Sequence, residues 1–312
     1  TLRGQLGMLG IGRVDVAGGI DDAVRQLRAK RYGLVLCDYH LNQKTDGQQL
    51  LEYLREQDLL PADCLFFMVT AESQYAKVAA VTEYRPDAYL LKPITAGDIE
   101  ERLKTQLQRR QALLPVLQKI AAKQLPEALA LCDEGLARKD RWYVQLLRLK
   151  GDVLLRLGRH EEARDLYRAA LAERADLVWA RLGLARALKA AGQHRQAADL
   201  GRELLASGDG ELNIAAHDVL AEALEALGDA RGAQAVLQEA SQVVPSAKRR
   251  RLLGDVAYRN GDLDLATECF RKVAQSTRGS MTALPQDALA LAQSLVDQGQ
   301  AGEAMAALED VN

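Results

Sequence analysis

The chain lacks the features that mark several large classes of protein. Its four cysteines are scattered singly among apolar neighbours and never approach the C-x-x-C spacing of a zinc site or redox pair. Aromatic residues make up 4% of the chain, and 41 basic side chains are balanced by 43 acidic ones, so no global field attracts nucleic acid or a membrane. No apolar run reaches the roughly 20 residues that cross a bilayer. These absences predict a cytoplasmic protein with structural cysteines.

The first 93 residues or so alternate short apolar runs with helix-like segments, which is the pattern of a parallel sheet covered by helices. Strands are predicted at Arg13 to Ala17, Tyr32 to Cys37, Cys64 to Thr70 and Ala88 to Leu91. Amphipathic stretches at about 20–30, 47–57 and 73–84 are long enough for crossover helices, and a last helix begins near Thr95. The fold class predicted for this part is therefore α/β.

From about residue 112 the sequence repeats. A glycine followed five residues later by alanine recurs at Gly158/Ala163, Gly192/Ala197, Gly228/Ala233, Gly261/Ala266 and Gly299/Ala304. An apolar residue nine positions after the glycine recurs at Tyr167, Leu237, Phe270 and Leu308, and Gly201 breaks this column. Such columns indicate helix-turn-helix units in which glycine permits positive φ and alanine allows close helix packing. Because one unit cannot bury its own apolar face, neighbours are expected to stack into an all-α solenoid.

Polar residues follow the strongest strands of the first part. Asp38 comes directly after one apolar run, Thr70 ends the next, and Lys92 with Pro93 follows the last. Because parallel strands end at one edge of their sheet, we expect these three groups to converge there.

This arrangement resembles the receiver domain of two-component response regulators, a flavodoxin-like fold. Asp38, Thr70, Tyr89 and Lys92 match the phosphoacceptor, switch hydroxyl, switch aromatic and lysine of that family in order and approximate spacing. The resemblance implies that a histidine kinase or phosphotransfer protein phosphorylates Asp38 in a bacterial phosphorelay. It also implies that Lys92 stabilises the acyl phosphate, and that Thr70 and Tyr89 move with it. The Lys92-Pro93 bond is a candidate cis peptide.

The same resemblance implies Mg²⁺, bound by Asp38, by the backbone carbonyl of His40 and by an acidic pair after the family's first strand. That strand and that pair do not occur here, since residue 1 falls within the first predicted helix. Two explanations stay open. Either the strand and the acidic pair lie upstream of residue 1, or the receiver is degenerate, in that it is not phosphorylated or takes its first strand from another chain.

The repeated part resembles the tetratricopeptide repeat, as in LLRLKGDVLLRLGRHEEARDLYRAAL at 146–171. We predict a receiver-like domain with a linking helix over 1–108 and about five to six repeats over 109–312, the first of them degenerate because Lys123 replaces its turn glycine. By analogy with the family, partner-binding residues are predicted on the groove face at Arg148, Arg186, Glu222, Arg251 and Asp255. Trp142 and Trp179 are candidates either for interface anchors or for core residues.

One basic cluster, Lys248 to Arg251, invites a nucleic-acid interpretation. Helical spacing spreads these charges around the axis and no aromatic platform accompanies them, so a solvated face or an acidic protein partner is favoured.

Two functions follow from these patterns. The first is a response regulator whose repeats bind an unidentified protein or peptide. The alternative is a phosphorylation-independent scaffold that uses the receiver fold for docking. A true enzyme is not predicted, because the repeats hold no catalytic cluster. The sequence leaves open whether the protein is a monomer or a homodimer.

Overall fold

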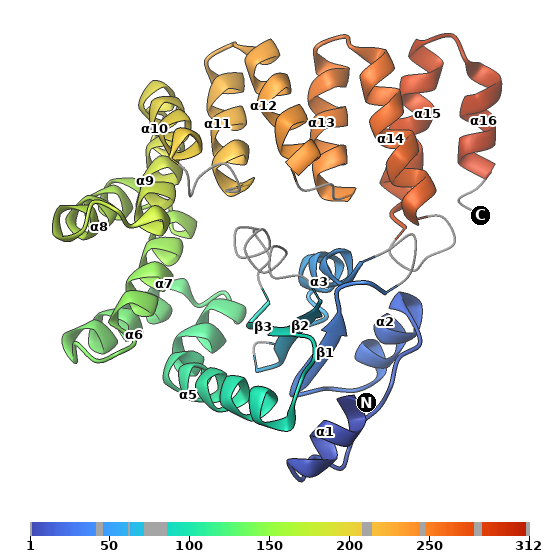
Figure 1. The fold of residues 1–312 in the computed structure, drawn as a ribbon. Helices are drawn as coiled ribbons and strands as arrows, with labels where there is room; N and C mark the ends of the chain where they lie inside the picture. Colours follow the sequence, from blue (N-terminus) through green and yellow to red (C-terminus); the bar gives the residue numbers. More distant parts are fainter. Residues whose placement is uncertain are drawn as a thin grey trace. The chain divides into compact units, whose positions relative to one another are not determined.

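The computed structural model describes residues 2–41, 46–61, 63–71, 86–207, 214–243, 247–277 and 283–309. The chain forms two compact units. The first comprises Thr1–Asp15, Tyr32–Cys37 and Leu60–Ala223, and the second comprises Val16–Arg31, Asp38–Leu59 and Leu224–Asn312. Figure 1 shows a small sheet followed along the chain by paired helices.

Before the repeats, the elements are α1 (Leu2–Met8), α2 (Ile20–Ala29), β1 (Leu34–Asp38), α3 (Gly47–Glu56), β2 (Leu65–Thr70), β3 (Ala88–Leu91) and α5 (Ala96–Ala121). The helices of the repeated part are α6 (Leu125–Ala137), α7 (Tyr143–Arg156), α8 (His160–Glu173), α9 (Val178–Ala190), α10 (His194–Ala206), α11 (Ile214–Ala226), α12 (Ala230–Val243), α13 (Ala247–Arg259), α14 (Leu263–Thr277), α15 (Pro285–Asp297) and α16 (Ala301–Glu309).

The sheet has three parallel strands in the order β1-β2-β3. Strand β2 pairs with β3 so that Phe67 lies opposite Ala88 and Thr70 lies opposite Leu91. Every residue of β2 is buried, as expected for the central strand of a parallel sheet. One face of the sheet packs its odd-numbered β2 side chains against Leu6 of α1 and Ile99 of α5.

The strand predicted at Arg13 to Ala17 is not present. This segment has no strand partner among the described residues, and Val16 is largely exposed. A strand forms only when its backbone is hydrogen-bonded to a neighbouring strand. Because Arg13 to Ala17 has no such neighbour among the described residues, its alternating apolar residues do not form a strand. The helix predicted at 73–84 lies outside the described residues.

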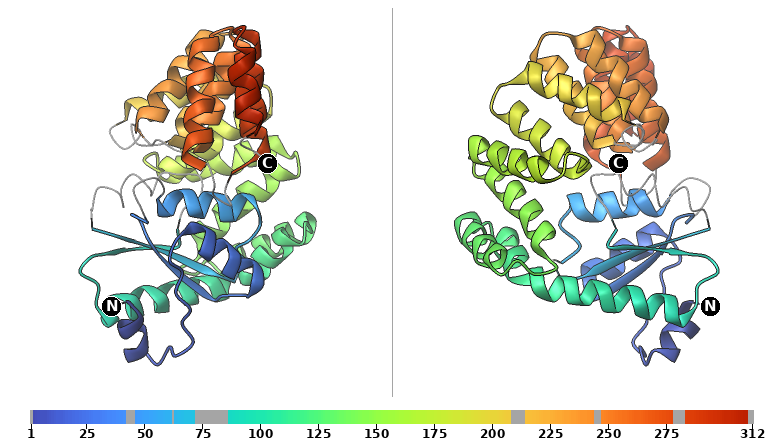
Figure 2. Two further views of the ribbon diagram at one scale, coloured as in Figure 1. Left: turned by 90° about the vertical axis from the view of Figure 1, so that its right-hand side faces the viewer. Right: turned by 60° about the vertical axis from the view of Figure 1, so that its left-hand side comes forward.

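Helix α5 belongs to two hydrophobic cores. Near its start Ile99 and Leu103 pack with the sheet, and near its end Leu113 and Val116 pack with α6 and α7. Its start is fixed by a capping box, in which the Thr95 hydroxyl accepts from the Asp98 N–H and the Asp98 carboxylate accepts from the Thr95 N–H. Figure 2 shows α5 as one long helix. The predicted boundary at 108/109 falls inside it.

The predicted turn glycines are confirmed. Gly158, Gly192, Gly228, Gly261 and Gly299 all have positive φ, between 72° and 82°. Lys123, which replaces glycine in the first unit, has φ of 57° between α5 and α6. A lysine in this left-handed region is uncommon, and its position shows that the first turn has the same geometry as the others.

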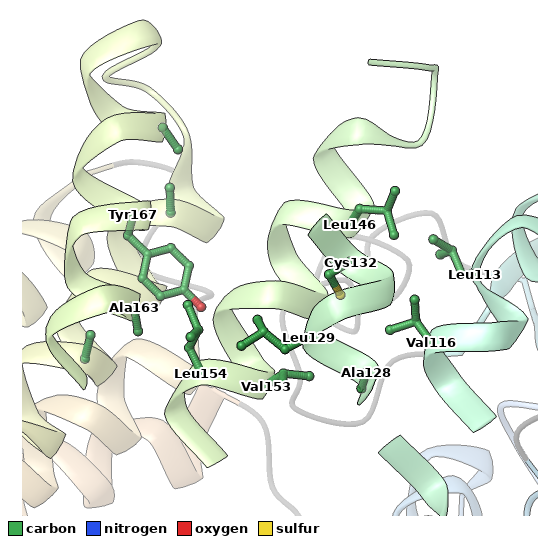
Figure 3. Close-up of a cluster of buried hydrophobic side chains, with 13 residues drawn as sticks. Leu113, Val116, Ala128, Leu129, Cys132, Leu146, Val153, Leu154, Ala163 and Tyr167 are labelled. Atoms are coloured by element: carbon green, nitrogen blue, oxygen red, sulfur yellow. The ribbon is translucent and has the colours of Figure 1, made fainter. Parts of the chain in front are cut away.

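The repeat core is built from the predicted columns. Figure 3 shows part of it, with side chains from α5, α6, α7 and α8 meeting around Leu129 and Leu154. The alanines five residues after the glycines are buried, as are Tyr167, Leu237 and Phe270. Leu308 is 41% exposed, so this member of the column is not a core residue. It lies on α16, beyond which no described helix covers it.

In the second unit, a partly buried ion pair joins neighbouring repeats. The Arg251 guanidinium on α13 donates to both carboxylate oxygens of Asp287 on α15, at 2.5 and 2.8 Å. Arg249, two residues earlier, is also buried. Arg249 and Arg251 therefore do not lie on a solvated face, which was one of the two interpretations that the sequence favoured for this cluster.

No helix in the described part of the chain is both long enough and apolar enough to span a membrane.

Candidate functional site

The predicted signalling residues lie at strand ends. Asp38 is the last residue of β1, Thr70 is the last residue of β2, and Lys92 directly follows β3. Because the three strands are parallel neighbours, their carboxyl ends lie at one edge of the sheet. The convergence of the three side chains on a single phosphoryl group stays a prediction.

The ends of β2 and β3 are held together by the backbone. The Lys92 N–H donates to the Thr70 carbonyl at 2.8 Å, which extends the ladder by one residue past Leu91. Thr70 is only 1% exposed, whereas Lys92 is exposed. Tyr89 lies opposite Met68 and has a buried hydroxyl oxygen. The Lys92-Pro93 bond is cis, as expected from the sequence.

Asp38 begins a short loop that leads into α3. One oxygen of its carboxylate accepts from the His40 N–H at 3.2 Å, and His40 forms an isolated bridge with Asp46. The Asp46 carboxylate in turn caps α3 by accepting from the Gln49 N–H at 2.8 Å. Burial raises the pKa of Asp46, while its bonds to Gln49 and Gln48 act in the opposite direction. This local network orients the predicted phosphoacceptor.

The described residues do not by themselves make a Mg²⁺ site. Asp38 and the His40 carbonyl are suitable oxygen donors, but the ion takes about six such ligands. Within the described ranges, no group of three His, Cys, Asp or Glu side chains could hold a metal ion.

An arginine links α5 to the end of the sheet where β2 and β3 begin, opposite the end that carries Asp38, Thr70 and Lys92. Arg110 donates to the Cys64 carbonyl at 2.9 Å and to the Asp87 carboxylate at 3.0 Å. The other oxygen of Asp87 accepts from the Phe66 N–H at 2.9 Å. Both charged side chains are largely buried, at 12% and 16% exposure. This cluster, here called the Arg110 clasp, joins the starts of β2 and β3 to the helix that enters the repeats.

Two of the predicted groove residues share a face of the first repeats. Arg148 lies on α7 with Asp152 and Arg156, at positions i, i+4 and i+8 of one stripe. Arg186 lies on α9, which packs beside α7. The Arg148 guanidinium lies 5.0 Å from the ring centre of Trp179. Asp152 is exposed at its surface, yet surrounding protein raises its pKa, against the effect of Arg186, Arg156 and Arg148. A carboxylate such as Asp152, which is accessible to solvent yet surrounded by protein, is typical of a concave surface.

Comparison with family models decides the assignment of these two parts. The response regulator receiver domain matches residues 1–104, and the tetratricopeptide repeat matches residues 120–178, 148–211 and 219–280. The chain carries a receiver domain followed by tetratricopeptide repeats.

The chain is similar to several solved structures. PilW, a widely conserved type IV pilus biogenesis factor, aligns with a TM-score of 0.53 at 14% identity, over 64% of this chain and 90% of PilW. A thermophilic TPR protein from Thermus thermophilus, TTC0263, aligns with a TM-score of 0.47 at 18% identity, over 60% and 99%. MamA residues 41 to the end, from Desulfovibrio magneticus RS-1, align with a TM-score of 0.45 at 20% identity, over 55% and 97%.

The other predicted groove residues of the repeat array are engaged in pairs or flanked by charges. Glu222 forms an ion pair with Lys189, and Arg251 is held by Asp287. Burial raises the pKa of Asp255, while Arg259 and Arg251 act against this. Glu222 and Arg251 therefore join neighbouring repeats, and partner binding by the five groove residues stays a prediction.

Sequence reasoning missed three features of the site. Asp152 and Arg156 could have been found from their spacing of four residues after Arg148. The Arg110 clasp had no signal, because its three segments are brought together only by the fold of the receiver domain.

The side of α7 opposite Arg148, Asp152 and Arg156 lines a pocket of about 400 Å³ between α6 and α8. Its walls include Tyr143, Leu147 and Leu154, with Glu162 and Glu173 among its polar residues. This pocket shows that the Arg148 stripe faces away from α6 and α8.

Proposed function

We propose that the protein is a two-component response regulator in which phosphorylation of Asp38 controls protein binding by the repeat array. The observation that carries this proposal is the position of Asp38, Thr70 and Lys92 at the ends of three adjacent parallel strands in a receiver domain. The donor would be the phosphohistidine of a histidine kinase or phosphotransfer protein.

In the proposed reaction, a carboxylate oxygen of Asp38 attacks the phosphorus atom. The new O–P bond forms as the P–N bond to the donor histidine breaks, and the imidazole leaves with the bonding electron pair. The Lys92 ammonium neutralises charge on the phosphoryl oxygens, and the Thr70 hydroxyl donates to one of them. Tyr89 then changes its position as Thr70 moves, which shifts the population between two surfaces.

The linker supports a route from the receiver to the repeats. Helix α5 starts four residues after Lys92 and is bound through Arg110 to Asp87, the residue before β3. A displacement of β3 would thus act on the helix whose far end packs in the repeat core.

Acetyl phosphate tests the first half of this proposal. Incubated with the full chain in Mg²⁺, it should add one phosphoryl group, with acetate as the leaving group, as measured by intact-protein mass spectrometry. Asp38→Asn should abolish the gain, and Lys92→Gln should slow it at least about tenfold. Asp58→Asn is the matched control, because it makes the same change at an exposed residue where Asn tolerates the positive φ. A gain that survives Asp38→Asn would refute phosphorylation at this site.

A constitutive scaffold is the second candidate, favoured by the small number of metal-binding groups among the described residues around Asp38. In that case partner binding would be the same in the wild type, Asp38→Ala and Asp38→Glu, and the chain would gain no mass from acetyl phosphate.

A further inference from the structure

The face formed by α7 and α9 carries an excess of guanidinium groups. Arg148, Arg156 and Arg186 all act to lower the pKa of one carboxylate, that of Asp152. Neither Arg156 nor Arg186 has a hydrogen-bond or ion-pair partner among the residues that the structure describes. The nearby Lys189 is occupied, since it forms an ion pair with Glu222 and lies close to Asp218. Arg156 and Arg186 therefore give this face a positive charge that Asp152 alone does not balance.

An aromatic platform fixes part of this charge in place. Tyr167 of α8 inserts between the two helices, where a Cβ added at Gly151 or Gly183 would lie 2.2 Å from its side-chain atoms. The Tyr167 ring meets Trp179 edge-on, with centroids 6.3 Å apart. Trp179 in turn supports the Arg148 guanidinium. The electron-rich ring attracts the guanidinium, and this cation–π contact restricts where the Arg148 side chain lies.

We propose that the α7–α9 face binds an acidic peptide segment, whose carboxylates pair with Arg148, Arg156 and Arg186 beside Trp179. Guanidinium forks match carboxylates bidentately, and an arginine already restrained beside an aromatic ring loses less side-chain entropy on binding. Charge complementarity selects this occupant over a basic or neutral one. The proposal rests on the partner-binding half of the proposed function and is independent of phosphorylation.

Fluorescence anisotropy on the full chain tests this inference. The probe is a short fluorescein-labelled peptide of alternating Asp and Glu, and its neutral twin has Asn and Gln at the same positions. The acidic peptide should bind, more weakly as salt increases, and the neutral twin should not. Arg186→Gln and Arg156→Gln should each raise Kd about tenfold, the effect of one charge-assisted contact.

Arg168→Gln is the matched control, because Arg168 is an exposed arginine on α8, and it should leave Kd unchanged. Circular dichroism of each variant separates lost binding from lost folding. Absence of binding, equal binding of the neutral twin, or equal weakening by Arg168→Gln would each overturn the proposal. Displacement of the acidic peptide by oligothymidine at equal concentration would also overturn it, in favour of a nucleic-acid surface.

The two proposals fail separately. Asp38→Asn should still bind the acidic peptide in the unphosphorylated state, and loss of peptide binding would leave the acetyl phosphate result unaffected.

Discussion

At the scale of single residues, Glu52 of α3 stands out as a carboxylic acid that is only 7% exposed. Burial raises its pKa to about 7, while a hydrogen bond from the Gln48 amide and the charge of Arg249 lower it. The folded state therefore binds a proton more tightly than the unfolded state. Its contribution to stability is fully present below about pH 4.5 and is lost as pH rises through about 7.

Glu52→Gln should remove this pH dependence. Glutamine is neutral at every pH, so at pH 8 the variant should be more stable than the wild type by up to about 3 kcal/mol, which is the free energy of moving a pKa from 4.5 to about 7. At pH 4 the two proteins should be nearly equal. Urea denaturation at both pH values measures the difference, and an identical gain at both would exclude the titration of Glu52 as its cause.

Gly183→Ala should destabilise the protein by about 2 kcal/mol, although alanine is the better helix former. The new methyl group would lie 2.2 Å from the Tyr167 ring. Gly302→Ala is the control, because a Cβ at Gly302 of α16 meets nothing within 4 Å and should stabilise by up to about 1 kcal/mol. Thermal unfolding of both variants should give shifts of opposite sign.

The sequence predicted the residues of the turns better than it predicted the buried polar residues. The turn glycines and Lys123 were predictable, because a turn with positive φ imposes a local demand on the residue itself. The burial of Glu52 was not predictable, because the sequence around it is typical of the polar face of an amphipathic helix. What covers a polar face is decided by tertiary contacts, which leave no local signal.

At the scale of elements, α5 is held to the sheet by one arginine. Arg110→Ala should cost about 2 to 3 kcal/mol, because it leaves the largely buried Asp87 carboxylate without its charged partner. The neighbouring Arg109→Ala is a close control, since Arg109 is exposed and donates only to Gln106. Chemical denaturation should separate the two, and equal stabilities would mean that the clasp contributes nothing.

The partly buried pair between α13 and α15 gives a second prediction of this kind. Arg251→Ala should destabilise by about 3 kcal/mol, because Asp287 is only 5% exposed. Arg271→Ala breaks the exposed pair with Glu303 and should cost less than about 1 kcal/mol. A double-mutant cycle with Asp287→Ala measures the coupling, and a value near zero would contradict the assigned pair.

Element prediction from sequence was accurate where the signal was local. The strands β1 and β2 follow from near-continuous apolar runs, which are typical of a parallel sheet, and β3 follows from a shorter run. Arg13 to Ala17 shows the limit, because alternation predicts a strand but cannot supply its neighbour.

At the scale of the whole molecule, the cores of the receiver domain and the first repeats share α5. Leu90→Ala in β3 should remove about 3 kcal/mol from the receiver core. Because Trp142 and Trp179, the two tryptophans of the chain, both lie in the repeats, their fluorescence reports the repeats alone. The urea midpoint that they report should fall in Leu90→Ala and should change little in Leu107→Ala, where the side chain is exposed on α5. An unchanged midpoint in Leu90→Ala would show that the two parts unfold independently.

Domain order was readable because the period of the apolar pattern changes along the chain. The boundary between the two domains could not be predicted, because a helix that packs in two cores has the same amphipathic pattern as a helix that packs in one.

This double role of α5 restricts how the protein can vary. Each residue of an α-helix advances its axis by about 1.5 Å and turns it by about 100°. One residue gained or lost between Leu103 and Leu113 would therefore turn the repeat-contacting side chains out of phase with those that contact the sheet. An indel of about seven residues, close to two full turns, or of about eleven, close to three, nearly restores the phase. The length of this segment is thus restricted by the angle between the side chains that contact the sheet and those that contact the repeats. A change of length at one end of α5 therefore requires a compensating change at the other.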